Sequence, residues 1–159
     1  LCDAFPIDAS DTAATLHDRL AALGARLIVE ALGKLPIVAV AQPADGITYA
    51  HKIEKSEAVI NWQKNAAELD RHIRAFNPFP GAQALYKGQT IKLWQASPLA
   101  GEGKVGQILA VDRKQLVVAC GNGALAITEL QKAGGKRLPV QQFLAGTALQ
   151  VGDCFDLPA

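Results

Sequence analysis

The residues of this chain best suited to chemistry are lysines and arginines, and that chemistry is the binding of phosphate. They lie within or after residues 71–81, where the sequence pattern changes from helical to strand-like. Cations held in a groove bind a nucleic-acid backbone without reading its bases. For any one of them, a solvated face without a partner is the simpler alternative. The candidate cations are Arg71, Arg74, Lys87, Lys92, Lys136 and Arg137.

Trp94 lies two positions after Lys92, in a segment whose side chains are expected to alternate between the two faces of a strand. The tryptophan and the lysine are therefore expected on the same face. The indole ring either stacks on a ligand or covers the core, and we favour the core.

No nucleophile–base pair, phosphate-binding loop or metal cluster is recognisable in the sequence. The glycines of residues 101–104 and 121–123 indicate turns, because neither segment is a phosphate-binding fingerprint. Two pairs of carboxylates lie in polar segments, so we expect them to be solvated rather than to act as acid and base. These pairs are Glu54 with Glu57 and Asp153 with Asp156.

Histidines and cysteines are scattered: His17, His51 and His72, and Cys2, Cys120 and Cys154. The histidines lack ligand-like spacing, so we expect surface or partly buried side chains and no metal. An odd number of cysteines without a secretory signal favours reduced thiols and a cytoplasmic protein. Cys120 lies in an apolar strand pattern and is expected in the core.

The composition indicates a packed chain with an uneven charge. Of the 159 residues, 50% are hydrophobic and 19% are charged, which favours a folded core over disorder. Residues 1–79 carry a net charge of −2 and residues 80–159 a net charge of +3. We expect no transmembrane helix. The chain begins at Leu1 and contains no methionine, so we expect a fragment or a processed chain.

Two helices are expected in the first half. Leucines at positions 16, 20, 23 and 27 form one apolar stripe, on a helix that begins at Ser10 or Asp11 and ends near Gly33. This stripe needs a partner that the few preceding residues do not provide, which suggests a missing N-terminal domain. Asn65 and Glu68 predict a capping box for a second helix to about Phe76. A short β-like piece is expected at residues 59–62.

Residues 71–81 separate this helical part from a part with strand periodicity. Pro78 and Pro80 stiffen the crossing, and Phe76 and Phe79 are expected to be buried there. We interpret the stretch as a hinge between two modules.

Five short strands are expected after Gly81, at residues 84–87, 90–96, 105–112, 115–120 and 124–131. Tight turns join them, with Gly88 marking a hairpin. So many short strands in about 50 residues suggest a small closed barrel, because closure removes exposed edges. A short helix is expected at residues 140–145, where it covers one end of the barrel.

The motif order resembles the C-terminal part of the methionyl-tRNA formyltransferase family. The similarity is carried by Arg74-Ala-Phe-Asn-Pro-Phe-Pro-Gly81 and Ile91-Lys-Leu-Trp-Gln-Ala96, and by residues 11–20, 47–53, 121–125 and 130–138. It covers essentially the whole chain. Single motifs are shared with relatives of the family, but their order and spacing are specific.

The resemblance implies an α+β fragment. Residues 1–35 would be the last strand and helix of a Rossmann-like formyltransferase domain, residues 36–80 a linker with a helix, and residues 81–159 a five-stranded OB-like barrel that binds tRNA. The complete enzyme would transfer formyl from 10-formyltetrahydrofolate to the amino group of initiator methionyl-tRNA, as a cytoplasmic monomer without a metal. Its catalytic motifs are absent here and are expected upstream of Leu1. By family position, Lys52 and Lys55 join the candidate tRNA contacts.

Two alternatives belong to other classes. A related small-molecule formyltransferase or formyl-folate hydrolase would need no basic groove. A non-enzymatic single-strand-binding barrel would not be expected to carry the long leucine-striped helix, unless those leucines proved to be exposed in the intact protein.

Overall fold

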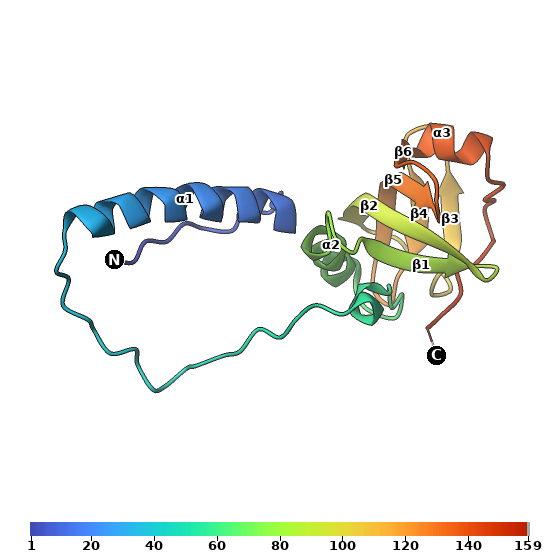
Figure 1. Ribbon diagram of the computed structural model, residues 1–159. Coiled ribbons are helices and arrows are strands. Elements are labelled where there is room, and N and C mark those ends of the chain that lie inside the picture. Colours follow the sequence, from blue (N-terminus) through green and yellow to red (C-terminus); the bar gives the residue numbers. More distant parts are fainter. Residues whose placement is uncertain (159) are drawn as a thin grey trace. The chain divides into compact units, whose positions relative to one another are not determined.

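Internal contacts divide the chain into two units, Leu1–Glu54 and Lys55–Ala159. The computed structural model describes residues 1–158. Figure 1 shows the single long helix α1 of the first unit and the sheet and short helices of the second.

Helix α1 spans Ala13–Gly33 and begins one position later than its expected cap. Thr12 is the N-cap, and the side chains of Thr12 and Thr15 form a capping box with the backbone. The expected cap at Ser10 or Asp11 was therefore wrong. Asp11 instead accepts hydrogen bonds from the Asp8 amide and the Thr15 hydroxyl, both near 2.9 Å.

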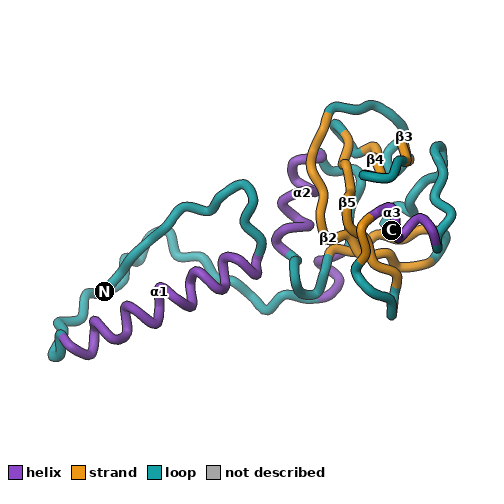
Figure 2. The backbone as a smooth tube through the Cα atoms, turned by 90° about the horizontal axis from the view of Figure 1, so that it is seen from above, coloured by secondary structure: helices purple, strands orange, loops and turns teal. Residues whose placement is uncertain are grey.

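The N-terminal segment runs antiparallel beside α1 (Figure 1). The guanidinium of Arg19 lies 4.1 Å above the Phe5 ring centroid and pairs with Asp11 at 2.7 Å. No residue of α1 is buried among the described residues, and Leu20 is 56% exposed. Of the stripe, Leu20 is exposed, whereas Leu16, Leu23 and Leu27 are half-buried. Residues 35–54 contain neither helix nor strand (teal in Figure 2).

The second unit opens with the 3-10 helix η1, Lys55–Ala58, and the helix α2, Ala66–Ala75. The capping box between Asn65 and Glu68 is confirmed. The expected strand at residues 59–62 is instead a connecting segment with one bridge, from Val59 to Gln83. Two side chains of this segment, Ile60 and Trp62, are nevertheless buried in the hydrophobic core.

One antiparallel sheet follows, with the strand order β1-β2-β5-β4-β3 and with β6 paired to β5. The bounds of the five expected strands shift by only a few residues, and β6 was not expected. The strands are β1 Ala82–Tyr86, β2 Gln89–Leu99, β3 Ile108–Val111, β4 Leu116–Ala119, β5 Ala124–Lys132 and β6 Leu138–Pro139.

The β1–β2 hairpin has the tight turn that the sequence indicated. Lys87 and Gly88 both have positive φ values, 50° and 75°, as a two-residue type I′ turn requires. Such a turn matches the right-handed twist of the strands on either side.

The C-terminal segment joins the two outer strands of the sheet. The Asp156 amide donates to the Leu85 carbonyl of β1 at 2.8 Å, and the Phe155 amide donates to Gly106, just before β3, at 2.9 Å. Backbone groups at both edges are thus paired by one segment. Helix α3, Val140–Ala145, has the bounds expected from sequence and contributes Val140 and Phe143 to the core.

The stretch 71–81 is not a boundary between two units, because α2 packs on β2 and β5 within the second unit. The division by contacts falls between Glu54 and Lys55 instead. The expected burial of Phe79 was also wrong, since this side chain is 68% exposed. Leu69 and Ile73 of α2 are fully buried, as expected.

Candidate nucleic-acid interface

Lys92 and Arg137, 45 positions apart in sequence, meet at the indole ring of Trp94. The Lys92 Nζ lies 5.6 Å from the ring centroid and the Arg137 Cζ lies 5.3 Å from it. A cation above an aromatic face is attracted by the ring quadrupole. The expected core position of Trp94 was wrong, because the ring is half-buried and outside the core cluster.

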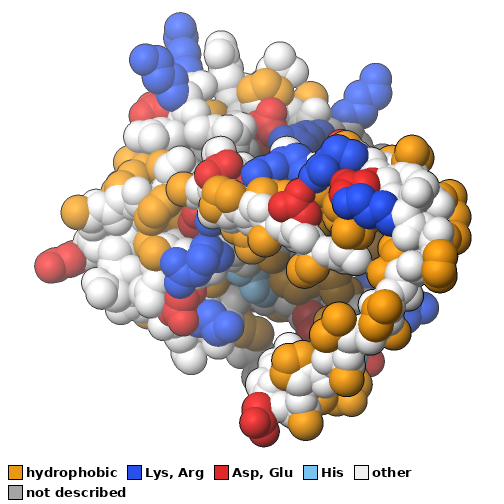
Figure 3. Space-filling view, turned by 90° about the vertical axis from the view of Figure 1, so that its left-hand side faces the viewer, with side chains coloured by type: hydrophobic (Ala, Val, Ile, Leu, Met, Phe, Trp, Pro, Cys, Tyr) orange, Lys and Arg blue, Asp and Glu red, His pale blue; other side chains and the backbone are white. Residues whose placement is uncertain are grey.

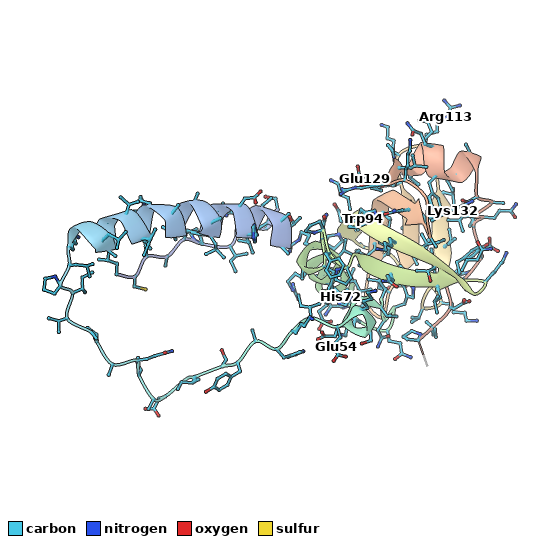
Figure 4. All side chains as sticks on the ribbon, viewed as in Figure 1. Glu54, His72, Trp94, Arg113, Glu129 and Lys132 are labelled. Atoms are coloured by element: carbon cyan, nitrogen blue, oxygen red, sulfur yellow. The ribbon has the colours of Figure 1, made fainter. Side chains whose placement is uncertain are left out.

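Two polar side chains of β5 complete this group. Trp94 Nε1 donates to the Gln131 side-chain oxygen at 2.8 Å. Arg137 Nε donates to Glu129 Oε2 at 2.6 Å, and its Nη2 faces the same oxygen. Figure 4 labels Trp94 and Glu129, which lie on the neighbouring strands β2 and β5. We call Lys92, Trp94, Glu129, Gln131 and Arg137 the indole cluster.

The two arginines of α2 differ in how accessible they are to a ligand. Arg74 Nε bonds to Asp70 Oδ2 at 3.0 Å, and its side chain is only 22% exposed. Arg71 is exposed on the same helix. Of the two, Arg71 is therefore the better placed to contact a ligand.

Lys87 lies at the β1–β2 turn rather than in the indole cluster. Its Nζ is 4.8 Å from the Tyr86 ring centroid and 3.8 Å from Asp153 Oδ1. The side chain of Tyr86, and then the charge of Asp153, raise the pKa of Lys87 above its ordinary value. The side chain stays 69% exposed, so its ammonium group is accessible to a ligand.

The remaining candidate cations are exposed. Lys52 belongs to the first unit and Lys55 begins η1 of the second. Lys136 directly precedes Arg137 in the turn between β5 and β6. On the face shown in Figure 3, lysine and arginine side chains lie between acidic and hydrophobic ones rather than in one continuous basic surface.

His72 is half-buried on α2, as the sequence analysis allowed. Its ring is 4.7 Å from the Phe76 ring centroid, and burial lowers the pKa of His72. A neutral imidazole is thus favoured near pH 7. Among the described residues, no group of three or more His, Cys, Asp or Glu side chains is arranged to hold a metal ion.

Sequence reasoning missed the roles of Gln131 and Glu129. A signal existed for Gln131, because Lys92 and Gln131 are direct partners in the antiparallel register of β2 and β5. Finding it required knowing that these two strands pair although 24 residues lie between them.

A search of the helices among residues 1–158 found none with the length and hydropathy of a membrane span.

A family model described as "Formyl transferase, C-terminal domain" matches residues 52–148. The chain belongs to this family. The formyl transferase C-terminal domain includes η1, α2, the whole sheet and α3 within these limits. The resemblance drawn from residues 74–81 and 91–96 is thereby confirmed.

Curated relatives agree with this family. A methionyl-tRNA formyltransferase of Dechloromonas aromatica (strain RCB) is 76% identical over 98% of this chain and 51% of its own length. The enzyme of the same name from Ralstonia pickettii (strain 12J) is 53% identical, over 94% of this chain and 48% of its own. The chain thus spans about half the length of the curated relatives it matches.

Solved structures support the fold. A variant of HypX from Aquifex aeolicus matches with a TM-score of 0.69, at 22% identity, over 88% of this chain and 27% of that one. HypX in complex with tetrahydrofolic acid matches with a TM-score of 0.60, at 22% identity, over 73% and 21% of the two chains. The mixed α+β fold with an antiparallel sheet and a short C-terminal helix is therefore confirmed.

Proposed function

We propose that this chain is the C-terminal portion of a methionyl-tRNA formyltransferase and that its role is to bind and position tRNA. The observation that carries this is 76% identity, over 98% of the chain, to a relative of that name. The complete enzyme transfers a formyl group from 10-formyltetrahydrofolate to the amino group of initiator methionyl-tRNA. Holding the two substrates in a productive geometry contributes much of the rate of such a transfer.

The proposed domain division follows from this role. Residues 1–35 are the C-terminal remnant of a Rossmann-like catalytic domain and form a helix, α1, without the expected strand before it; the stripe of α1 packs on the rest of that domain. Residues 36–80 are a linker whose second part, from Lys55, packs with the sheet. Residues 81–159 are an OB-like barrel, an interpretation supported by the C-terminal segment that bonds to both outer strands.

The proposed tRNA contacts differ in how they are held. Lys52, Lys55, Arg71 and Lys136 are exposed and suit long-range attraction to phosphate. Lys87 and Arg74 have internal ion pairs. Lys92 and Arg137 are ordered on the indole ring. The contacts proposed are Lys52, Lys55, Arg71, Arg74, Lys87, Lys92, Lys136 and Arg137.

The catalytic residues and the folate site belong, in this proposal, to the part of the complete enzyme that precedes these residues. This chain binds no folate and is inactive alone. The complete enzyme acts in the cytoplasm as a monomer and uses no metal. HypX, a structural neighbour, binds tetrahydrofolic acid, which supports a folate co-substrate for the complete enzyme.

The test is tRNA binding to this chain across a salt series. Electrostatic binding to phosphates predicts an affinity that falls linearly with salt on logarithmic axes, by roughly 0.7–0.9 per phosphate contact. Absence of binding at low salt, or binding without a salt slope, would contradict the proposal.

A second experiment separates tRNA from small-molecule substrates. In the complete enzyme, Lys136→Glu reverses one exposed charge and is expected to raise KM for tRNA while leaving KM for the folate unchanged. Unchanged kinetics on tRNA would favour a small-molecule formyltransferase or formyl-folate hydrolase instead.

A further inference from the structure

Trp94 occupies an irregular position on β2. The register of β2 with β5 shifts on both sides of Gln95, and Trp94 has no partner in the ladder among the described residues. Such a bulge reorients a side chain relative to its neighbours in the strand. The carbonyl of Trp94 accepts instead from the side-chain amide of Asn77 at 3.1 Å. The irregularity is thus stabilised by the segment after α2.

The same segment lies against the ring. A Cβ on Gly81, which has a φ of +84°, would stand 2.8 Å from Cη2 of Trp94 and 3.2 Å from Cδ of Lys92. The Lys92 ammonium donates to the Pro80 carbonyl at 2.7 Å. The close approach at Gly81 therefore permits the ring and the lysine stem to pack there, and it determines where the Lys92 charge lies.

The indole N–H connects the ring to a second basic segment. It donates to Gln131, whose side-chain amide donates to the Gly135 carbonyl at 2.8 Å. Gly135 directly precedes Lys136 and Arg137. Trp94 is thereby linked through Gln131 to the segment that precedes Lys136 and Arg137, and it also contacts Lys92 of its own strand.

Arg137 keeps binding capacity in this arrangement. Its Nε and Nη2 face Glu129, while 44% of the side chain stays exposed. The cluster holds two cations and one carboxylate, and adjacent Lys136 adds a further positive charge. Long basic side chains lose rotamer freedom when they grip a ligand. Cations that are already ordered on a ring lose less.

We propose that Trp94 is a positioning residue for tRNA, which orders Lys92, Lys136 and Arg137 as a preformed clamp for consecutive phosphates of the RNA backbone. This rests on the proposed function. The ring contacts Lys92 and Arg137 as cations above its face, and its N–H is linked through Gln131 to Gly135, which directly precedes Lys136.

The experiment measures tRNA binding by this chain and its variants in salt series. Trp94→Leu removes both the ring and the N–H and is expected to weaken binding about tenfold at low salt and to lower the salt slope by roughly one. Trp94→Phe keeps a ring beneath Lys92 and Arg137 but loses the N–H that bonds to Gln131, so it is expected to weaken binding less than Trp94→Leu does. Leu99→Ala, 36% exposed at the far end of the same strand, is the matched control and should bind as the parent does.

A double-mutant cycle separates positioning from general stability. If Trp94 acts through Arg137, Arg137→Gln weakens binding in the parent but has much less effect in the Trp94→Leu background, because interacting residues are not additive. Additive effects, or Trp94→Leu with unchanged affinity and slope, would overturn the proposal.

A variant that keeps the Trp94 ring tests the proposal even if the Trp94 variants fail to fold. Gln131→Leu removes the link to Gly135, so it should lower the salt slope by roughly one, and Lys136→Gln should then add little. An unchanged slope in Gln131→Leu overturns the proposed link to Lys136. Failure of the parent chain to bind tRNA at all would overturn the proposed function itself, which is a different result from parent-like binding by these variants.

Discussion

The hydroxyl of Tyr86 donates a 2.6 Å hydrogen bond to Oδ2 of Asp153, 67 positions further along the chain. The same oxygen accepts from the Gln150 amide at 3.0 Å, and neighbouring Asp156 accepts from the Gly88 amide at 3.0 Å. The expectation that Asp153 and Asp156 are merely solvated was therefore wrong. These carboxylates attach the C-terminal segment to the first hairpin of the sheet.

Tyr86→Phe is expected to destabilise the second unit by removing this bond. A hydrogen bond to a charged group is among the stronger kinds, so the unfolding midpoint should fall by about 4–8 °C. Thermal unfolding followed by circular dichroism measures this. The control is Tyr49→Phe, because Tyr49 is 91% exposed in the first unit. Equal midpoints for the two variants would show that the bond contributes nothing.

Stability should fall with acid partly through Asp153. The hydrogen bond from Tyr86, followed by that from the Gln150 amide, holds the pKa of Asp153 below its ordinary value of 3.8. A carboxyl with a lowered folded-state pKa stabilises the fold above its unfolded-state pKa, and this contribution is lost as pH falls toward the folded-state value. Urea unfolding between neutral and acidic pH should therefore show a smaller decline for Asp153→Asn than for the parent. Parallel declines would contradict this assignment.

Gly121→Ala is expected to be among the most damaging small substitutions. A Cβ there would lie 1.8 Å from the Gln63 carbonyl oxygen, and the Gly121 amide donates to the carbonyls of Trp62 and Lys64. Backbone must move to make room, so a loss of roughly 3 kcal/mol or failure to fold is expected. Gly146→Ala is the control: its nearest atom would be 4.0 Å away, and its effect should stay within about 0.5 kcal/mol. Similar stabilities would contradict the packing described.

Cys120 should resist thiol reagents in the folded chain. It is 5% exposed, and burial raises the pKa of its thiol from an ordinary 9.0 to about 11. Labelling at mildly alkaline pH should therefore proceed at exposed Cys2 first, at half-buried Cys154 next, and at Cys120 only after unfolding. Rapid labelling of Cys120 before unfolding would argue against its burial.

The raised pKa of the Cys120 thiol also predicts that the stability of the fold decreases at alkaline pH. A thiol whose folded-state pKa is raised stabilises the fold fully below its unfolded-state pKa, and this stability is lost as pH rises from about 9 to about 11. Cys120→Ala removes this dependence and should flatten the alkaline limb of the stability profile. Unfolding midpoints of the parent and the variant across this range provide the comparison.

Asn77→Ala tests the support of the Trp94 bulge. The variant removes the 3.1 Å hydrogen bond to the partly buried Trp94 carbonyl, and loss of such a bond costs roughly 0.5–1.5 kcal/mol. Phe79→Ala is a control from the same segment, because that side chain is 68% exposed and should change stability by less than about 0.5 kcal/mol. Chemical denaturation of both variants gives the comparison. An unaffected Asn77→Ala would mean that the bulge needs no side-chain donor.

Local sequence signals determined the positions of α1, α2 and the first hairpin. The capping box of Asn65 with Glu68, the leucine spacing of α1 and the Lys87-Gly88 turn each depend on residues within a few positions of one another. Such interactions are readable from the chain because their geometry is set by the helix or turn alone. The family resemblance likewise depended on the order of short motifs.

Only the tertiary structure decided which distant residues meet. The side on which Trp94 lies depends on a shift in strand register, and its encounter with Arg137 depends on the pairing of β2 with β5 and β5 with β6. The contact of Asp153 with Tyr86 likewise requires the C-terminal segment to return to the first hairpin. Strand pairing and register reflect packing of the whole core rather than local preference, so no short stretch of sequence contains this information.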